Sequence, residues 1–175
     1  MEFQKKVSDK LEEVQFFIEL YNALEMSGVS FTRNTIKEKE ASYILSAILN
    51  GFYSATELLK NNKKNIEQVI KFKNQYPVIY SRSEKGGLRN TTVHVKHVGI
   101  DYSGYISQSG NNLNFNFKRS PKLITNPTNI SEKVILNHNK YFYLKIDDEH
   151  IRVSDLVGDH YYTLERFAQI LISAS

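Results

Sequence analysis

Apolar side chains recur every three or four residues in the first third of the chain and every second residue in much of its later part. The first pattern begins near the N-terminus with a stripe that would form one face of a helix: Phe3, Val7, Leu11, Val14, Ile18 and Tyr21. This spacing predicts an amphipathic helix. Gly28 follows the stripe, and we expect it to end this helix.

A second helix is predicted over residues 37–60, and its apolar residues occupy two neighbouring sides. One side carries Ile44, Ala47, Ile48, Gly51, Ala55 and Leu58, and the next carries Leu45, Leu49 and Phe52. A helix with apolar residues on more than one side is expected to lie centrally in the fold. Asn61, Asn62 and Asn65 then mark a break. A short third helix over residues 66–72 is expected to stop before Pro77.

The period changes to two after residue 100, which indicates strands. Leu113, Phe115 and Phe117 alternate with polar residues after a Gly110-Asn111 turn, so this segment is predicted to be a hairpin. A second set of strands is predicted at residues 134–136, 141–146 and 151–153. Ser154 has the position of an N-cap, and the helix after it has an apolar face that includes His160.

These patterns predict a mostly α fold with a β-rich insertion, in one domain over residues 1–175. Residues 1–100 would form a helical bundle core. Antiparallel hairpins would fill residues 101–153, and a C-terminal helix at residues 154–175 would pack back on the bundle. A chain of 175 residues is long enough to bury a core of this kind without disulfides.

Composition narrows the classes of function. The chain has no cysteine, which excludes disulfides, thiol catalysis and zinc sites built on cysteine. No stretch approaches the roughly 20 apolar residues of a membrane span, and the first ten residues lack the apolar core of a secretory signal. We therefore expect a cytoplasmic protein with no membrane association.

Charge is unevenly distributed along the chain. The net charge is +4, but residues 60–96 contain nine Lys or Arg and two Glu, while residues 1–59 carry a net charge of −3. Such a basic segment attracts polyanions, of which nucleic acid is the usual candidate. A solvated basic face without a ligand is an equally simple interpretation.

One short motif in this basic segment has the residues that RNA cleavage needs. Arg89 and Asn90 are followed by His94, and on a helix the Arg and His side chains would lie within about 140° of each other. Arginine offers a permanent positive fork for phosphate, and histidine can take or give a proton near neutral pH. Propensity alone favours a strand over residues 91–98, because Thr91, Val93 and Val95 alternate with other residues.

The segment Gly86-Gly87-Leu88-Arg89-Asn90-Thr91-Thr92-Val93-His94, followed by Gly99-Ile100-Asp101-Tyr102, resembles the fourth helix of the HEPN superfamily. The signature of that family is Arg, four to six residues and then His, with Asn, Asp or His usually after the Arg. The helix at 37–60 is also similar to the second helix of the family in Ala41, Ala47, Gly51, Phe52, Ser54, Ala55 and Glu57.

The resemblance implies a four- or five-helix bundle that forms a homodimer, with the two motif helices meeting at one composite, metal-independent ribonuclease site. It implies that residues 86–98 are helical, that RNA is cleaved by 2′-hydroxyl attack, and that the protein acts as a toxin or in phage defence. Lys96 stands where the branch paired with nucleotidyltransferase antitoxins has Tyr, so regulation through that Tyr is not expected.

Two other interpretations stay open. The chain could be a non-catalytic HEPN-like module that binds nucleic acid, an antitoxin or another protein partner. It could also be a small α+β domain in which residues 91–98 form a strand and the motif is accidental.

The candidate catalytic residues are Arg89, Asn90 and His94. The candidate RNA-binding residues are the neighbouring basic side chains Lys60, Lys63, Lys64, Lys71, Lys73, Arg82, Lys85 and Lys96. We expect no metal site and no cofactor. The run Asp147-Asp148-Glu149 is interpreted as a solvated turn. His138 and His150 lie in or beside turns without obvious partners, and His160 is interpreted as a packing residue.

Overall fold

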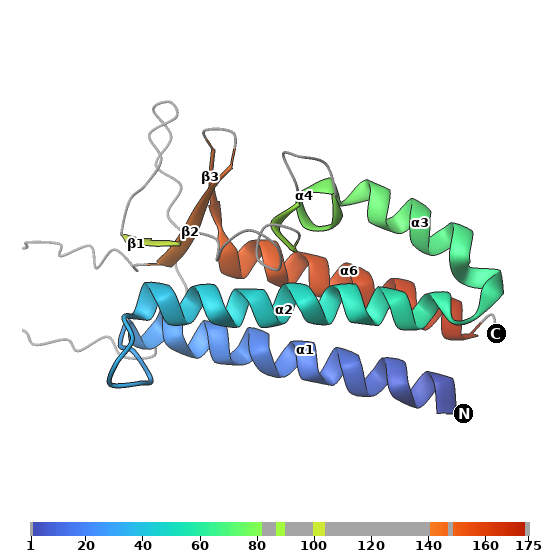
Figure 1. Ribbon diagram of the computed structural model, residues 1–175, viewed down its shortest axis with the longest axis horizontal. Helices are drawn as coiled ribbons and strands as arrows, with labels where there is room; N and C mark the ends of the chain where they lie inside the picture. The colour runs from blue at the N-terminus through green and yellow to red at the C-terminus, as the bar shows by residue number, and fades with distance from the viewer. Residues whose placement is uncertain (1, 82–86, 90–99, 104–140, 147–148, 174–175) are drawn as a thin grey trace, which may run out of the picture.

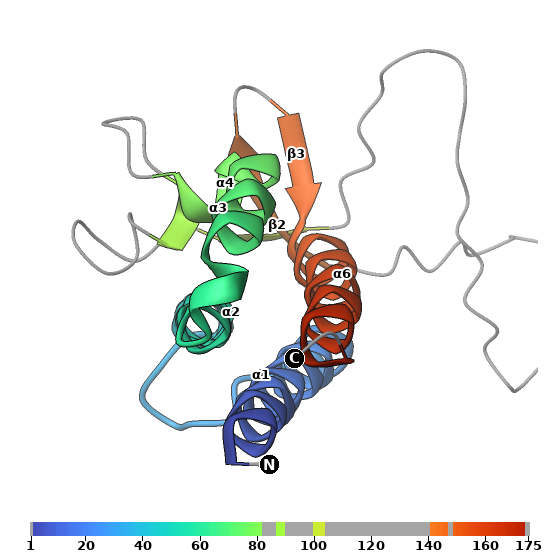
Figure 2. The same cartoon turned by 90° about the vertical axis from the view of Figure 1, so that its right-hand side faces the viewer.

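A computed structural model of the chain describes residues 2–81, 87–89, 100–103, 141–146 and 149–173. Three long helices lie side by side: α1 (Glu2–Ser27), α2 (Lys37–Lys60) and α6 (Val153–Ser173) (Figure 1). The start of α1 and the end of α6 lie at the same end of this bundle. The shorter helices α3 (Ile66–Gln75) and α4 (Pro77–Tyr80) lie on the side of α2 that faces away from α1 (Figure 2).

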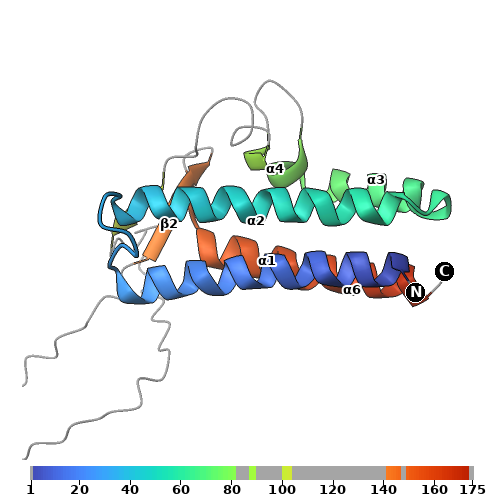
Figure 3. The same cartoon turned by 60° about the horizontal axis from the view of Figure 1, so that its bottom comes forward.

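The helices α1 and α2 form an antiparallel pair (Figure 3). The predicted stripe of α1 is buried at Val7, Leu11, Val14, Ile18 and Tyr21. Gly51 of α2 allows the two backbones to approach, because a Cβ atom there would overlap Cγ2 of Val14. The first helix ends as predicted, since Gly28 has a φ of +63° and its N–H donates to the Leu24 carbonyl.

The prediction for α2 is confirmed in both its ends and its burial. The helix spans Lys37–Lys60, and it buries Ile44 and Ile48 on one side and Leu45, Leu49 and Phe52 on the next. It contacts α1, α3 and α6, so it occupies the central position that its apolar pattern predicted.

The break between α2 and α3 is made by asparagine side chains. Asn62 caps the short 3₁₀ helix η1 (Lys63–Asn65) by accepting the Lys64 N–H at 3.2 Å. Asn65 is buried and donates from Nδ2 to the Leu59 carbonyl at 3.3 Å. The third helix ends at Gln75, before Pro77, as expected. Pro77 then begins α4, a single turn that the sequence pattern did not predict.

A small antiparallel sheet lies at the end of the bundle where α1 ends and α2 begins (Figure 1). Its strands are β1 (Asp101–Ser103), β2 (Tyr141–Ile146) and β3 (Glu149–Arg152), in the order β1-β2-β3. The predicted hairpin of β2 and β3 is confirmed, with Ile146 opposite Glu149. The strands predicted within residues 105–117 and at 134–136 lie outside the described residues.

The boundary of the last helix differs from the prediction. The helix α6 begins at Val153, so this residue does not end the strand and Ser154 is not an N-cap. The Ser154 hydroxyl instead donates to Glu25 at 3.1 Å. Glu25 is 5% exposed, and it also accepts the Phe142 N–H at 3.0 Å and an Arg152 N–H at 2.5 Å. This carboxylate therefore ties the end of α1 to the sheet and to α6.

The fold is therefore mostly helical with a small antiparallel sheet. The apolar face predicted for the last helix is confirmed, because Val157, His160, Leu164, Ala168 and Leu171 are buried. In the part of the chain that the structure describes, none of the helices combines the length and the apolar character needed to cross a membrane.

Candidate functional site

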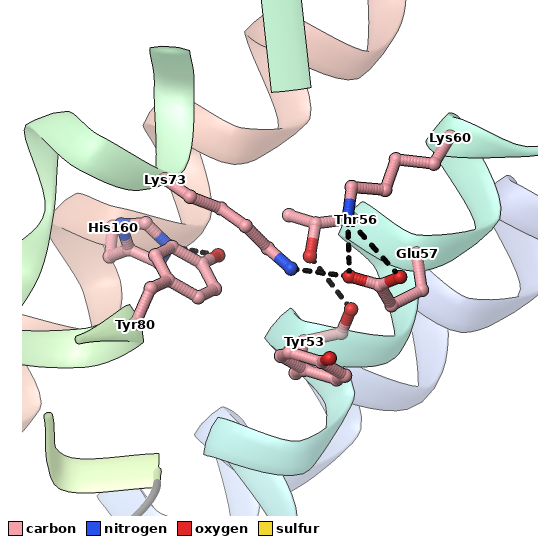
Figure 4. Close-up of polar contacts among 7 residues, drawn as sticks. All are labelled: Tyr53, Thr56, Glu57, Lys60, Lys73, Tyr80 and His160. Carbon is pink, nitrogen blue, oxygen red and sulfur yellow. Dashed lines mark hydrogen bonds and ion pairs between the residues drawn. The ribbon is translucent and has the colours of Figure 1, made fainter. Parts of the chain in front are cut away.

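A group of polar and aromatic side chains lies where α2 meets α3 and α4 (Figure 4). Tyr53 and Glu57 are one turn apart on α2, and Lys60 follows on the same side. Lys73 extends from α3 toward Glu57. These four residues are called the α2–α3 cluster below.

Glu57 joins the cluster through two ion pairs. Its carboxylate is 2.5 Å from Nζ of Lys73 and 3.3 Å from Nζ of Lys60. Burial alone would raise the pKa of Glu57, but the hydrogen bonds and charges of the two lysines outweigh it and hold the pKa below its usual value. Glu57 is therefore an anion at neutral pH, which reduces the positive charge of the cluster.

Lys73 is unusual among the basic residues of this region because its side chain is only 13% exposed. Burial lowers the pKa of its ammonium group, and Glu57 offsets part of this effect. The ammonium also lies 4.0 Å from the ring centroid of Tyr53. Its charge is thus balanced by a carboxylate and by the negative face of an aromatic ring.

Arg89 reaches the same aromatic ring from a different segment. Its Cζ atom lies 3.9 Å from the ring centroid of Tyr53. Leu88 and Arg89 have helical backbone, Leu88 is buried in the core, and Arg89 is half-buried. The first motif residue is therefore held against α2.

Gly87 fixes the start of the segment that carries Arg89. Its N–H donates to the Ser81 carbonyl at 2.8 Å, just after α4. A Cβ atom at position 87 would lie 2.7 Å from the Ser81 nitrogen and 2.8 Å from the Ile79 carbonyl oxygen. Only glycine allows this close approach of two backbones, so Gly87 determines where the following residues lie.

His160 of α6 lies deeper in the same region, and the prediction that it is a packing residue is confirmed. It is 3% exposed, and its Nε2 is 2.8 Å from the Tyr80 hydroxyl. The rings of Phe52, Phe72 and Tyr76 pack around it with centroid distances of 4.6, 5.7 and 4.8 Å. Burial lowers the pKa of His160 to about 4, so it is neutral at physiological pH.

The structure brings together some of the predicted site residues. Arg89, Lys60 and Lys73 contribute to or adjoin the α2–α3 cluster. Lys63 and Lys64 are exposed on η1, directly after α2. Lys71 is exposed on α3, where it pairs with Glu67 at 3.0 Å. The other candidates, Asn90, His94, Arg82, Lys85 and Lys96, lie outside the described residues.

Two members of the cluster were not predicted as site residues. Tyr53 and Glu57 are four residues apart in the second half of α2, among its partly exposed positions. That spacing places them on one face, and Glu57 is also one of the positions that resemble the second HEPN helix. Their partners Lys73 and Arg89 are 16 and 36 positions away from them in the chain, so the pairing depends on the tertiary fold.

Within the residues that the structure describes, no group of three or more potential metal ligands comes together. Glu149 begins β3 and is exposed, whereas Asp147 and Asp148 lie outside these ranges, as does His138. His150 is exposed on β3, and its ring contacts that of Tyr143 with a centroid distance of 4.9 Å.

Comparisons of the chain with protein-family models, with curated proteins and with solved structures give no match.

Proposed function

We propose that the chain is a metal-independent endoribonuclease of HEPN type, which cleaves RNA at a site shared by two copies of the chain. The observation that carries this proposal is the placement of Arg89. Its guanidinium lies 3.9 Å from the Tyr53 ring centroid, on a half-buried side chain at the edge of a polar cluster. The helical backbone at Leu88 and Arg89 agrees with a motif helix that starts here.

Arg89, Asn90 and His94 would divide the chemistry among them. His94 accepts the proton of the RNA 2′-hydroxyl, whose oxygen then attacks the adjacent phosphorus. Arg89 stabilises the negative charge that develops on the phosphate oxygens, and Asn90 orients one of those oxygens. The bond from phosphorus to the 5′-oxygen breaks, and that oxygen takes a proton as it leaves. The product ends in a 2′,3′-cyclic phosphate.

A second copy of the chain supplies the group that this reaction needs on the opposite side of the phosphate. One Arg–His pair provides a single acid or base, whereas the leaving oxygen needs a proton while the 2′-hydroxyl loses one. In a two-fold symmetric dimer, the second subunit contributes its own His94 to the site, so no further residue type is needed. The resemblance to HEPN proteins implies the same arrangement, together with a role as a toxin or phage-defence effector.

The exposed lysines near the cluster would hold the RNA backbone. Lys63 and Lys64 lie on η1, and Lys71 lies on the outer side of α3. Lys73 has a different role in this proposal, because it is mostly buried and paired with Glu57. We therefore assign phosphate contact to the exposed lysines and internal support to Lys73.

The test is cleavage of a mixed RNA pool in the presence of EDTA. We expect wild-type protein to cut, and both His94→Ala and Arg89→Ala to abolish cutting while leaving most of the binding. His150→Ala and Arg33→Ala are matched controls, because both side chains are exposed. His150 belongs to β3 and Arg33 to the connection between α1 and α2, and these elements lie at the sheet end of the bundle (Figure 1). Equal cleavage by His94→Ala and wild type would refute the assignment.

One observation favours a second candidate, a non-catalytic module that binds a protein partner. A groove of about 280 Å³ lies between α3 and α6, and its lining includes Phe72, Phe167 and Ile170. Ile170 is 64% exposed and Phe167 beside it is partly buried, so the groove has an apolar lining that is open to solvent and suits contact with another protein. RNA that neither binds nor is cut would favour this alternative.

A further inference from the structure

We infer that Tyr53 is the positioning residue that sets the place and orientation of the Arg89 guanidinium. This inference rests on the proposed function, which makes Arg89 the residue that stabilises the transition state. Tyr53 itself touches no reacting atom in this scheme. It acts through Arg89, and its effect should appear in the rate of the chemical step.

The contact has the geometry of a cation–π interaction. Arg89 Cζ lies 3.9 Å from the ring centroid, well inside the distance of about 6 Å at which such contacts stabilise. A flat guanidinium on a ring loses freedom of tilt and translation, because both groups are planar. The ring therefore restricts the guanidinium more strongly than an aliphatic side chain of similar size could.

Tyr53 is itself held firmly. It projects from the second half of α2, where the neighbouring residues Phe52 and Ala55 are fully buried. The Tyr53 ring is half-buried against the core. The Tyr53 ring is held in place by a long, buried helix. Its position therefore does not depend on the segment that carries Arg89.

The α2–α3 cluster supports this contact electrostatically. The Lys73 ammonium lies 4.0 Å from the same ring centroid, so two cations share one aromatic ring. The two cationic groups are therefore at most about 8 Å apart, and like charges at that distance repel each other. Glu57 is 2.5 Å from Lys73 Nζ and offsets that charge, which reduces the repulsion of Arg89. This gives Glu57 and Lys73 a role in the site without contact with RNA.

The backbone at Gly87 supports the same arrangement from the other side. Gly87 is joined to Ser81 by a hydrogen bond of 2.8 Å, and Leu88 is buried with 9% exposure. Arg89 follows directly, so its main chain is anchored within two residues. The side chain still has several rotatable bonds, and the contact with Tyr53 restricts their conformers.

The experiment compares Tyr53→Phe with Tyr53→Leu in the full chain. Both variants keep an apolar side chain on α2, but only phenylalanine keeps the aromatic face. We expect Tyr53→Leu to lower kcat about tenfold with little change in KM, because the lost interaction acts in the transition state. We expect Tyr53→Phe to retain kcat within about threefold.

Tyr162→Leu is the matched control. Tyr162 is 60% exposed on α6, and its ring contacts the Arg166 guanidinium, whose Cζ lies 5.7 Å from the ring centroid. The same substitution there removes a cation–π contact outside the cluster, and we expect wild-type kinetics. Thermal melts of all three variants show that each is folded before its rate is compared.

A second measurement separates this inference from the proposed function. In NMR spectra, the δ-protons of Arg89 should be shifted upfield by the Tyr53 ring in wild type and Tyr53→Phe, and the shift should vanish in Tyr53→Leu. If wild type cuts no RNA, the proposed function fails, and the ring shift alone decides whether Tyr53 holds Arg89. An Arg89 signal that is unchanged in Tyr53→Leu, or a Tyr53→Leu enzyme with wild-type kcat, would overturn the inference.

Discussion

The Tyr80 hydroxyl and Nε2 of His160 lie 2.8 Å apart inside the bundle, and this pair joins the turn of α4 to the last helix. The other ring nitrogen of His160, Nδ1, is buried and has no hydrogen-bond partner among the residues that the structure describes. A proton added to His160 would therefore place a charge among aromatic rings without a compensating group.

This environment predicts that the protein loses stability in acid through His160. Burial lowers the pKa of His160 to about 4 in the folded chain, while the unfolded side chain titrates near its usual value of 6.5. Between these two values the unfolded chain binds a proton that the folded chain does not, so the free energy of unfolding decreases as pH falls. The loss should be negligible at pH 7.5, begin near pH 6.5 and reach about 3 kcal/mol at pH 4.

Urea unfolding between pH 4 and pH 7.5 measures this effect. His160→Gln keeps a hydrogen-bonding side chain but cannot titrate, so its stability should change less with pH than that of wild type. His150→Gln is the control, because His150 is exposed on β3. The carboxylates titrate in all three proteins and cancel in the comparison. Parallel curves for wild type and His160→Gln would contradict the assignment.

The pair Glu57 and Lys73 should contribute measurably to stability. Removing the carboxylate in Glu57→Gln leaves the Lys73 ammonium mostly buried beside Tyr53, and we expect a loss of about 1–2 kcal/mol. Lys73→Met removes the buried charge as well, so the double variant should recover part of that loss. Chemical denaturation of the two single variants and the double variant measures the coupling.

Glu67 and Lys71 form the control pair for this cycle. They are four residues apart on α3, and their side chains are 81% and 72% exposed. Exposed pairs of this kind contribute less than about 0.5 kcal/mol. A coupling for Glu57 and Lys73 as small as that of the control would show that burial adds nothing to the ion pair.

Gly51 provides a test of the α1–α2 contact. Alanine is favoured over glycine in a helix by about 1 kcal/mol, but the added Cβ would overlap Cγ2 of Val14. A β-branched side chain cannot turn away easily, so we expect Gly51→Ala to destabilise by about 1 kcal/mol net. In a Val14→Ala background the same substitution should stabilise. Gly158→Ala is the control, because a Cβ there meets no atom within 4 Å.

The sequence predicted the long helices well and the contacts between distant segments poorly. The approximate range predicted for α2 is confirmed, because its apolar stripes are long and Asn61 follows them at once. The start of α6 was misplaced because the Ser154 hydroxyl reaches Glu25, which is 129 positions away, instead of capping its own helix. No local pattern carries that information.

In the candidate site, too, the residue marked by a local motif was predicted and the residue that depends on a long-range contact was not. Arg89 was identified from its own segment, since the motif is local. Tyr53 was missed because its importance lies in its contact with Arg89, and that contact exists only once α2 and the segment after α4 are packed together. Lys73 was grouped with the exposed lysines by charge alone, whereas the fold makes it mostly buried.

RNA binding should be electrostatic and independent of sequence. Replacing Lys63 and Lys64 together with Gln should weaken binding of every RNA alike and reduce the slope of log K against log salt by about 1.4, for two lost contacts with single-stranded RNA. Arg33 and Lys39, exposed before and within the first turn of α2, provide a control pair of equal charge at the other end of that helix. Binding that does not respond to salt would favour the protein-partner alternative.

The chemistry of cleavage gives the most specific prediction. The proposed site contains a guanidinium, an amide and one imidazole per chain, and a single imidazole provides too few ligands to hold a metal ion that activates an external nucleophile. The attacking group should therefore be the 2′-hydroxyl of the RNA itself. A single 2′-deoxy substitution at the scissile nucleotide should block cutting without weakening binding, and the same substitution one nucleotide away should have no effect.

Cleavage should persist in EDTA, depend on a titration near neutral pH through His94, and give a product that ends in a 2′,3′-cyclic phosphate. Mass spectrometry of the fragments identifies that end group directly. Cutting of the deoxy substrate, or a strict requirement for Mg²⁺, would show that Arg89, Asn90 and His94 do not act as proposed.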